Sequence, residues 1–373
     1  MNTTDDIQKA ITSWVEKRRC KFGPFGRFKF ARSSRCSSLF ASATAMLDVY
    51  DYFKMLGSLD EKKKTDWKDY LLSFQEPESG LFIDRRNRKS IQKDFIWERV
   101  EKADTVKTVC ALKCLGAGPA YHIVSCHPKH LMGCIESTGA LKKWIVRQDW
   151  DMRPCGCAME TYRAASLILE APLPSDRQRD LLNVLHQFFE MNQNMKNRLW
   201  GNAACPDDEL ASAARIVFTI FGENGWPVPY QEEITSWIET VIMNQPPARH
   251  IEALRNRICL FIESRIDRSH MPMRMTGPRS FYTAIQEAIY RDGILVFPGE
   301  DTYRRIIDAT MQSIRPFQSR DGGFSYYTMG KATSHHNGVF LGQGKNEGDF
   351  LAVSHMSFVH AALVLLSEIA GKR

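Results

Sequence analysis

Two acidic residues stand two positions apart in a short turn of the chain. Asp149 and Asp151 flank Trp150, follow a predicted helix that ends at Gln148 and precede the turn-forming run Arg153-Pro-Cys-Gly-Cys157. Two carboxyl groups at this spacing can have separated pKa values and divide the roles of general acid and general base. We therefore take Asp149 and Asp151 as candidate catalytic residues. The other interpretation is that one of them caps the following helix.

A second concentration of polar side chains lies in the long, Gly-rich loop from Tyr326 to Gly348 and just after it. Long ordered loops in compact domains are often functional. We expect Asp349 and His355, at the start of the last predicted helix, to line a site as catalytic residues. The loop residues expected to bind substrate are Tyr326, His335, His336 and Glu347. A loop without fixed structure is the alternative.

Two tryptophans and two arginines complete the set of candidate substrate-binding residues. Trp150 and Trp200 lie at helix ends, where their rings could serve as platforms for sugar rings. Packing inside the protein is the alternative. Arg85 and Arg86 could meet a diphosphate or a uronate, or could be an ordinary surface charge run.

Ligand-type side chains for a metal are present without a standard spacing. Cys155 with Cys157, and the cluster from His122 to Cys134, contain thiols and imidazoles, but neither follows a known zinc pattern. No metal ligand set is predicted. Zn or Mg is kept as an open expectation for a cofactor, and free core cysteines are the ordinary explanation.

Helical periodicity dominates the elements that must position these residues, and alternating strand patterns are scarce. About twelve helices joined by short Gly/Pro loops predict an all-α fold. The predicted helices cover residues 39–56, 64–74, 103–115, 138–147, 158–169, 177–192, 209–221, 231–243, 251–262, 281–290, 301–314 and 354–370.

Several of these helices end in an aromatic or aliphatic pair followed by Gln and a turn. Gln75, Gln148, Gln193, Gln245 and Gln318 occupy this position. Their spacing fits repeat units of about 45–50 residues, each a helical hairpin that must stack on its neighbours. A Gln amide can hold the following turn, and Gly supplies the left-handed step.

The loop Phe317-Gln-Ser-Arg-Asp-Gly-Gly-Phe324, with the weaker Phe74-Gln-Glu-Pro-Glu-Ser-Gly-Leu-Phe82, resembles the Gln-x-x-Asp-Gly loops of the prenyltransferase and squalene-cyclase repeat superfamily. The resemblance implies an α/α toroid of about six helical hairpins with inner and outer helices. It also implies a terpenoid-cyclase-like or prenyltransferase-like enzyme that acts on an isoprenoid-type substrate in a central cavity by acid-initiated chemistry. Asp349 followed by His355 is similar to the late Asp-then-His helix of prenyltransferase β subunits. The Asp-x-Asp-Asp acid motif of the cyclases is missing.

Two other functions stay open. A carbohydrate-active toroid, as a glycoside hydrolase, lyase or epimerase, would use the same carboxylates with the aromatic platforms. A non-catalytic binding module would grip a protein or a glycan. An apolar cavity would favour isoprenoid chemistry, a polar cleft rimmed by aromatic residues would favour carbohydrate chemistry, and a centre filled by side chains would favour the binding module.

Length and composition set the outer limits. The 373 residues are 43% hydrophobic and 25% charged, which is typical of folded soluble proteins, and the net charge of +7 is compatible with a small, anionic substrate. We expect one toroid domain over residues 39–373, preceded by a basic, aromatic N-terminal arm over residues 1–38. We expect no nucleic-acid partner, no membrane span and, without an apparent targeting segment, a cytoplasmic location.

Overall fold

The computed structural model describes residues 3–86, 94–123, 129–201, 206–222, 224–244, 247–266, 300–336 and 339–371. In these residues nearly all regular structure is helical, which confirms the all-α prediction. The exceptions are β1 (His335–His336) and β2 (Val339–Phe340), two residues each, which pair antiparallel. The predicted helix over residues 281–290 lies outside the described residues.

Most helices follow the periodicity of the sequence. In chain order the helices are α1 (Thr4–Arg18), α2 (Leu39–Thr44), η1 (Ala45–Asp51), η2 (Met55–Ser58), α3 (Glu61–Leu72), α4 (Asp94–Cys114), α5 (Lys129–Met132), η4 (Gly133–Ile135), α6 (Thr138–Val146), α7 (Pro154–Glu170), α8 (Ser175–Met191), α9 (Pro206–Ile216), η5 (Val217–Gly222), α10 (Gln231–Asn244), α11 (Ile251–Glu263), α13 (Glu300–Ile314), η6 (Arg315–Phe317) and α14 (Phe350–Gly371). Helix α4 begins nine residues before its predicted start, and the helix predicted over residues 39–56 is divided into α2, η1 and η2.

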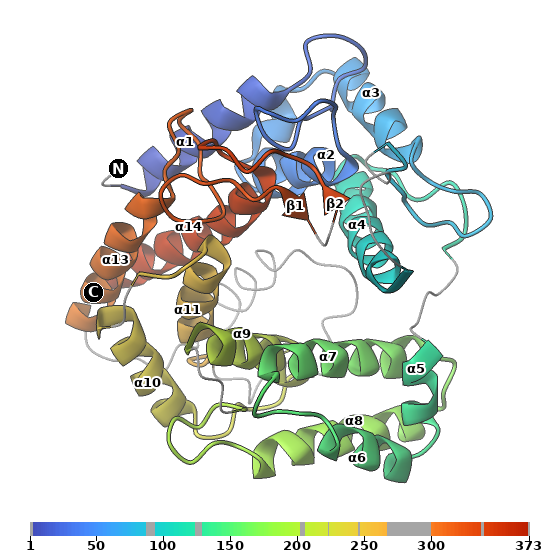
Figure 1. Ribbon diagram of the computed structural model, residues 1–373, viewed down its shortest axis with the longest axis vertical. Coiled ribbons are helices and arrows are strands. Elements are labelled where there is room, and N and C mark those ends of the chain that lie inside the picture. The colour runs from blue at the N-terminus through green and yellow to red at the C-terminus, as the bar shows by residue number, and fades with distance from the viewer. Residues whose placement is uncertain are drawn as a thin grey trace.

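Among the described residues, an inner series of helices is surrounded by an outer one. In Figure 1, α4, α2, α14, α11, α9 and α7 follow one another around the inside, with α3, α1, α13, α10, α8 and α6 on the outside. Neighbours along the inner series pack against each other, from α4 with α2 through α14 and α11 to α9 with α7. The segments that enter α11 and α14 therefore meet at one place in the interior.

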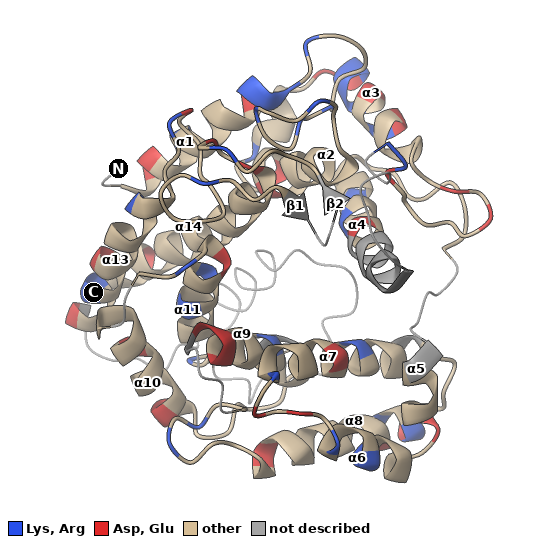
Figure 2. Ribbon diagram, viewed as in Figure 1, with Lys and Arg blue, Asp and Glu red and all other residues tan. Residues whose placement is uncertain are grey.

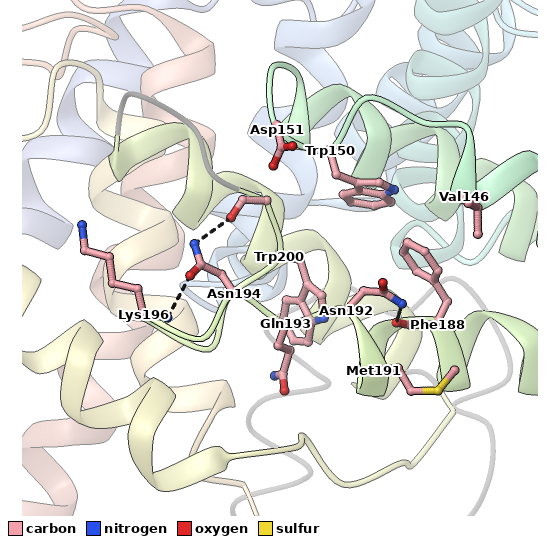
Figure 3. Close-up of a pocket in the computed structure, with 11 residues that line it drawn as sticks. Val146, Trp150, Asp151, Phe188, Met191, Asn192, Gln193, Asn194, Lys196 and Trp200 are labelled. Atoms are coloured by element: carbon pink, nitrogen blue, oxygen red, sulfur yellow. Dashed lines mark hydrogen bonds between the residues drawn. The ribbon is translucent and has the colours of Figure 1, made fainter.

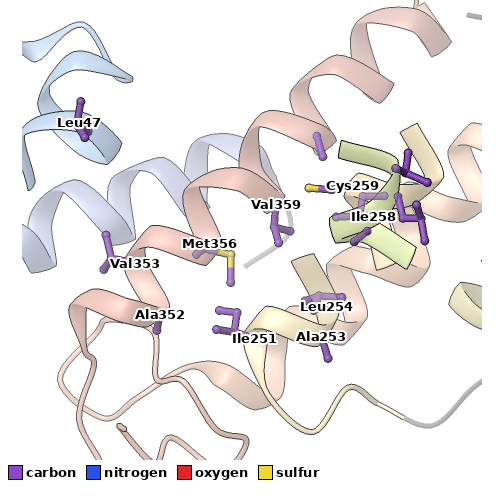
Figure 4. Close-up of a cluster of buried hydrophobic side chains, with 14 of the residues drawn as sticks. Leu47, Ile251, Ala253, Leu254, Ile258, Cys259, Ala352, Val353, Met356 and Val359 are labelled. Atoms are coloured by element: carbon purple, nitrogen blue, oxygen red, sulfur yellow. The ribbon is translucent and has the colours of Figure 1, made fainter. Parts of the chain in front are cut away.

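The interface of α11 and α14 forms part of the hydrophobic core. Ile251, Leu254 and Ile258 of α11 lie near Val353 and Met356 of α14, all of them buried (Figure 4). By length and composition α14 could cross a membrane, but 72% of its most apolar window is buried inside the molecule. The surrounding helices thus account for its apolar character.

Helix α1 and the segment over residues 28–38 pack into the body. Thr3 and Asp6 form a capping box at the start of α1, and the buried stripe of α1 faces α14 and η1. Phe28 and Phe30 are fully buried, and the Phe28 ring lies 5.3 Å from that of Trp67. Helix α1 was not predicted, although its stripe of Ile7, Ile11, Trp14 and Val15 carries the helical spacing.

The Gln/Gly loops form the turns that the repeats predict. The Gln75 amide nitrogen donates to the carbonyl oxygens of Gly80 and Tyr121, both at 2.8 Å, and its oxygen accepts from the Ala120 nitrogen at 2.7 Å. Gln193 donates to the Arg198 carbonyl at 2.9 Å. Gln75 and Gln193 thus hold their own loops closed, and Gln75 also ties its loop to the segment after α4. Gln148 instead donates to the Trp144 carbonyl of its own helix at 3.4 Å, and Gln245 lies outside the described residues.

Candidate active site

A cluster of ionisable side chains lies where α11 and α14 begin. It consists of Glu252 and Arg255 on α11, His250 just before α11, Arg215 on α9, Tyr326 in the loop before α14, and His355 on α14. We call this cluster the Glu252 site. Figure 2 shows acidic residues at the start of α9 and both signs of charge on α11. The inner series of helices therefore brings together side chains up to 140 positions apart in the sequence.

Glu252 is the centre of the site. Its Oε1 lies 3.4 Å from an Arg215 nitrogen and 3.7 Å from an Arg255 nitrogen, and its Oε2 accepts a hydrogen bond from the Tyr326 hydroxyl at 2.8 Å. Burial alone would raise the pKa of Glu252, but the surrounding positive groups and the Tyr326 hydroxyl outweigh it and hold the pKa below its usual range. Glu252 is therefore ionised at neutral pH.

His355 is held in one tautomer. Its Nδ1 lies 3.2 Å from an Arg255 nitrogen, and a guanidinium can only donate, so the neutral imidazole carries its proton on Nε2. Burial, and then the charge of Arg255, hold the pKa of His355 well below its usual range. His355 is therefore a neutral donor at neutral pH.

Tyr326 is fixed by two neighbours. Its ring stacks on His250 at a centroid distance of 5.3 Å with an interplanar angle of 1°. Burial, followed by the charge of Glu252, raises the pKa of the Tyr326 hydroxyl, and burial lowers the pKa of His250. Both rings are therefore neutral at neutral pH, and the Tyr326 hydroxyl keeps its proton.

The two guanidinium groups are positioned by groups outside the site. Arg215 also donates to the Ala211 carbonyl at 3.1 Å and lies 2.8 Å from the Cys155 sulfur. Arg255 donates through Nε to the Asn256 amide oxygen at 3.1 Å. Between 20% and 24% of each of the Arg215, Arg255 and Glu252 side chains is exposed, so solvent reaches the charged groups.

An ion pair borders the site on the side of α14. The Lys107 ammonium group lies 2.9 Å from a carboxylate oxygen of Asp48 and donates to the Ser354 hydroxyl at 3.0 Å. Its charge contributes to the low pKa of His355. The pair thus holds α4, η1 and α14 together next to the site.

Asp349 and Glu347, both predicted to belong to a site, hold the chain together. Asp349 is fully buried, and its carboxylate accepts the backbone N–H groups of Ala352, Tyr326 and Thr333 at 2.8 to 3.0 Å. Burial raises the pKa of Asp349 to about 7, although these hydrogen bonds lower it. Glu347 accepts hydrogen bonds from the backbone and hydroxyl groups of Ser33. Asp349 acts on the site by fixing Tyr326.

Asp149 and Asp151 lie in an exposed turn before α7. Asp149 accepts a hydrogen bond from the Met152 nitrogen at 3.1 Å, as a turn-forming residue does. Both residues are exposed. The contacts described for them do not reach Asp349 or His355.

Trp150, Asp151 and Trp200, predicted separately, line one pocket of about 540 Å³, which we call the Trp150 pocket (Figure 3). Two loops form it, one before α7 and one between α8 and α9. Trp200 is buried, donates to the Phe189 carbonyl at 2.7 Å and stacks on Phe221, so it is largely a packing residue. Trp150 is only partly buried.

The remaining candidates lie elsewhere. Arg85 pairs with Glu76, while Arg86 donates to the Tyr70 hydroxyl at 3.0 Å and lies over the Phe74 ring. These contacts fit a surface charge run. His335 and His336 form β1, and only their backbone is described.

The described residues contain no group of three or more His, Cys, Asp and Glu side chains able to hold a metal ion. Part of the predicted cluster from His122 to Cys134 lies outside them. The eight described cysteines are free thiols.

Sequence patterns alone missed Glu252, Arg255, Arg215 and His250. The first two stand three positions apart on a helix, a spacing that is also that of an ordinary surface ion pair. The composition of the predicted helix over residues 251–262 could have pointed to Glu252 and Arg255. Both charged residues stand in a helix that is otherwise largely apolar.

Fold and site together define an all-helical protein with a charged cluster at the start of two interior helices. Comparison of the chain with protein-family models, with curated proteins and with solved structures found no match.

Proposed function

We propose that the protein is an enzyme with an α/α-toroid fold. At the Glu252 site it would remove a proton from a carbon atom of an anionic saccharide. The order of helix contacts, with an inner and an outer series, supports the toroid (Figure 1). We also propose that the inner series of helices closes into a ring between α7 and α4.

The observation that carries the function is the pairing of one carboxylate, Glu252, with two guanidinium groups and a phenol. Guanidinium groups bind carboxylates through paired hydrogen bonds. Arg215 and Arg255 therefore suit the carboxylate of a uronic acid. The partial exposure of both side chains leaves access for it.

Binding of such a carboxylate changes the protonation chemistry of Glu252. Arg215 and Arg255 are two of the groups that keep its pKa low, and a substrate carboxylate would neutralise part of their charge. The pKa of Glu252 then rises, and Glu252 becomes a better base for a proton on the carbon next to the substrate carboxylate.

In an elimination, Glu252 takes the proton of the carbon next to the carboxylate, a C=C bond forms, and the bond to the leaving glycosidic oxygen breaks. Because Glu252 is then neutral, it no longer raises the pKa of Tyr326, so Tyr326 can give its proton to the leaving oxygen and recover one from Glu252 through their hydrogen bond. His355 donates a hydrogen bond through Nε2.

This arrangement favours a lyase or an epimerase within the carbohydrate-active class. Hydrolysis of a glycosidic bond needs two carboxyl groups across the bond, and the Glu252 site has one. Isoprenoid chemistry, which the sequence resemblance implies, remains the alternative. It needs a protonated acid, whereas Glu252 is ionised and Asp349 is occupied by backbone N–H groups.

The test is turnover of polygalacturonate, alginate and hyaluronan, followed by the ultraviolet absorbance of unsaturated uronate and by NMR for epimers. We expect activity on one polymer, lowered about 10²–10⁴-fold in Glu252→Gln and Tyr326→Phe. The matched control is Tyr327→Phe, because Tyr327 is a neighbouring, exposed tyrosine. Circular dichroism checks that each variant is folded.

Two results would contradict the proposal. One is wild-type protein that changes none of the three polymers. The other is a folded Glu252→Gln variant that keeps full activity.

A further inference from the structure

The Trp150 pocket has the properties of a ligand site that the Glu252 site does not use. Its volume of about 540 Å³ lies within the range of small-molecule pockets. In Figure 3, Trp150 and Asp151 lie on one side, and Trp200 and Asn192 lie on the other. Aromatic rings next to amide and charged groups provide both an apolar surface and hydrogen-bonding partners.

The aromatic surface is rigid. The Trp150 indole N–H donates to the Ile145 carbonyl at 3.2 Å, and its ring packs against Phe188 and Phe189 at centroid distances of 5.7 and 5.4 Å. A ring fixed in this way loses little conformational entropy when it binds a ligand. The electron-rich ring face attracts the C–H groups of a pyranose ring.

The polar groups of the pocket are available. Asp151 and Lys196 are exposed, and neither side chain has a hydrogen bond or an ion pair within the described chain. Asp151 can accept hydrogen bonds from sugar hydroxyls, and Lys196 can donate to a hydroxyl or to a uronate carboxylate.

The first turn of α7 connects the pocket to the Glu252 site. A Cβ atom at Gly201 would lie 2.5 Å from Pro154 and 2.6 Å from the Trp150 carbonyl oxygen, so the pocket loops touch the start of α7. The next residue, Cys155, lies 2.8 Å from a nitrogen of Arg215. Consecutive Cα atoms are about 3.8 Å apart. The two sites therefore flank the same helix end.

We propose that the Trp150 pocket binds a second sugar unit of an oligosaccharide whose anionic unit occupies the Glu252 site. This inference rests on the proposed function, and it makes the substrate an oligomer or a polymer. Trp150 supplies the stacking surface, while Asp151 and Lys196 bind the hydroxyl and carboxylate groups.

The experiment measures binding and turnover of galacturonate, digalacturonate and hexagalacturonate, with binding followed by tryptophan fluorescence and calorimetry. The variant is Asp151→Asn with Lys196→Gln, which changes exposed side chains only. The control is Asp180→Asn with Arg179→Gln, an exposed pair on α8 outside the pocket. We expect hexagalacturonate to bind the variant about tenfold more weakly and the control unchanged, with galacturonate affinity unchanged in both.

Three outcomes separate the two proposals. Equal hexagalacturonate affinity in wild type and variant overturns the pocket inference, even where the enzyme is active. Weaker hexagalacturonate binding in the variant, in a protein without turnover, supports the pocket and counts against the proposed reaction. Absence of hexagalacturonate binding to the wild type overturns the pocket inference, and turnover of alginate or hyaluronan would then leave the proposed reaction standing.

Discussion

A single carboxylate, Glu252, is central to the proposed reaction. Because two guanidinium groups lie within 4 Å of it, Glu252 is anionic before any ligand binds. The geometry of Arg215 is easily tested by Arg215→Lys. Lysine keeps the positive charge but lacks the planar guanidinium group with its paired N–H donors.

For Arg215→Lys we expect the KM for an anionic saccharide to rise about tenfold, with a smaller change in kcat, because the substrate carboxylate loses a paired hydrogen bond. Steady-state kinetics measure this, and Arg179→Lys on the exposed surface of α8 is the control. An unchanged KM would show that Arg215 does not bind substrate.

A second prediction at the residue scale concerns His360, which is buried and hydrogen-bonded to the Tyr52 hydroxyl at 2.8 Å. Burial lowers the pKa of His360 to about 4. In the unfolded chain this histidine binds a proton near pH 6.5. The contribution of neutral His360 to the free energy of unfolding is therefore fully present above pH 6.5 and is lost as the pH falls towards 4. His360 should contribute about 2 kcal/mol to this loss by pH 5.

Urea unfolding of wild type and His360→Gln at pH 7 and pH 5 checks this expectation. Glutamine keeps a hydrogen-bonding partner for Tyr52 and does not titrate. The free energy of unfolding of the variant should fall less between the two pH values than that of the wild type. Equal losses would show that His360 does not titrate on unfolding in this range.

At the scale of elements, the loop glycines show how the turns are specified. Gly80 and Gly116 both have a φ of +69°, but their surroundings differ. A Cβ atom at Gly80 would lie 2.0 Å from the His122 carbonyl oxygen, whereas at Gly116 nothing lies within 4 Å. Backbone strain is therefore common to both positions, and the clash is specific to Gly80.

We expect Gly116→Ala to lower the free energy of unfolding by about 1 kcal/mol and Gly80→Ala by at least about 2 kcal/mol more. Chemical denaturation of both variants gives the difference. Equal losses would mean that the contact between the loop and residue 122 relaxes freely.

Most helices could be predicted from sequence because their apolar spacing is local information. Which residues distant in the sequence come together in space is not local information, because it depends on how the helices pack. Tyr326 and His355, two of the residues predicted to belong to a site, lie in one cluster, and Glu252 reaches them through the packing of α11 on α14. Asp349 was misleading for a physical reason, because a carboxylate at a helix start serves equally well as a cap.

At the scale of the whole molecule, Trp14 joins the first helix to the last loop. It is buried, donates to an Asp321 carboxylate oxygen at 3.0 Å and fills the space beside Gly323 and Gly348. We expect Trp14→Ala to cost about 3–5 kcal/mol of unfolding free energy. Phe22→Ala, at an exposed position, should change it by less than about 0.5 kcal/mol.

Thermal and chemical denaturation measure both variants. A loss at Trp14 no larger than that at Phe22 would show that α1 docks without contributing to the stability of the core.

The contact between α1 and the segment before α14 also bears on synthesis of the chain. Ser33 meets Glu347, and Trp14 meets Asp321, about three hundred residues later. A ribosome adds about 5–20 residues per second. Tens of seconds therefore pass between the synthesis of α1 and the synthesis of the segment before α14. During this interval Trp14 lacks its partners Asp321, Gly323 and Gly348, and a chaperone that binds aromatic segments would find its target there.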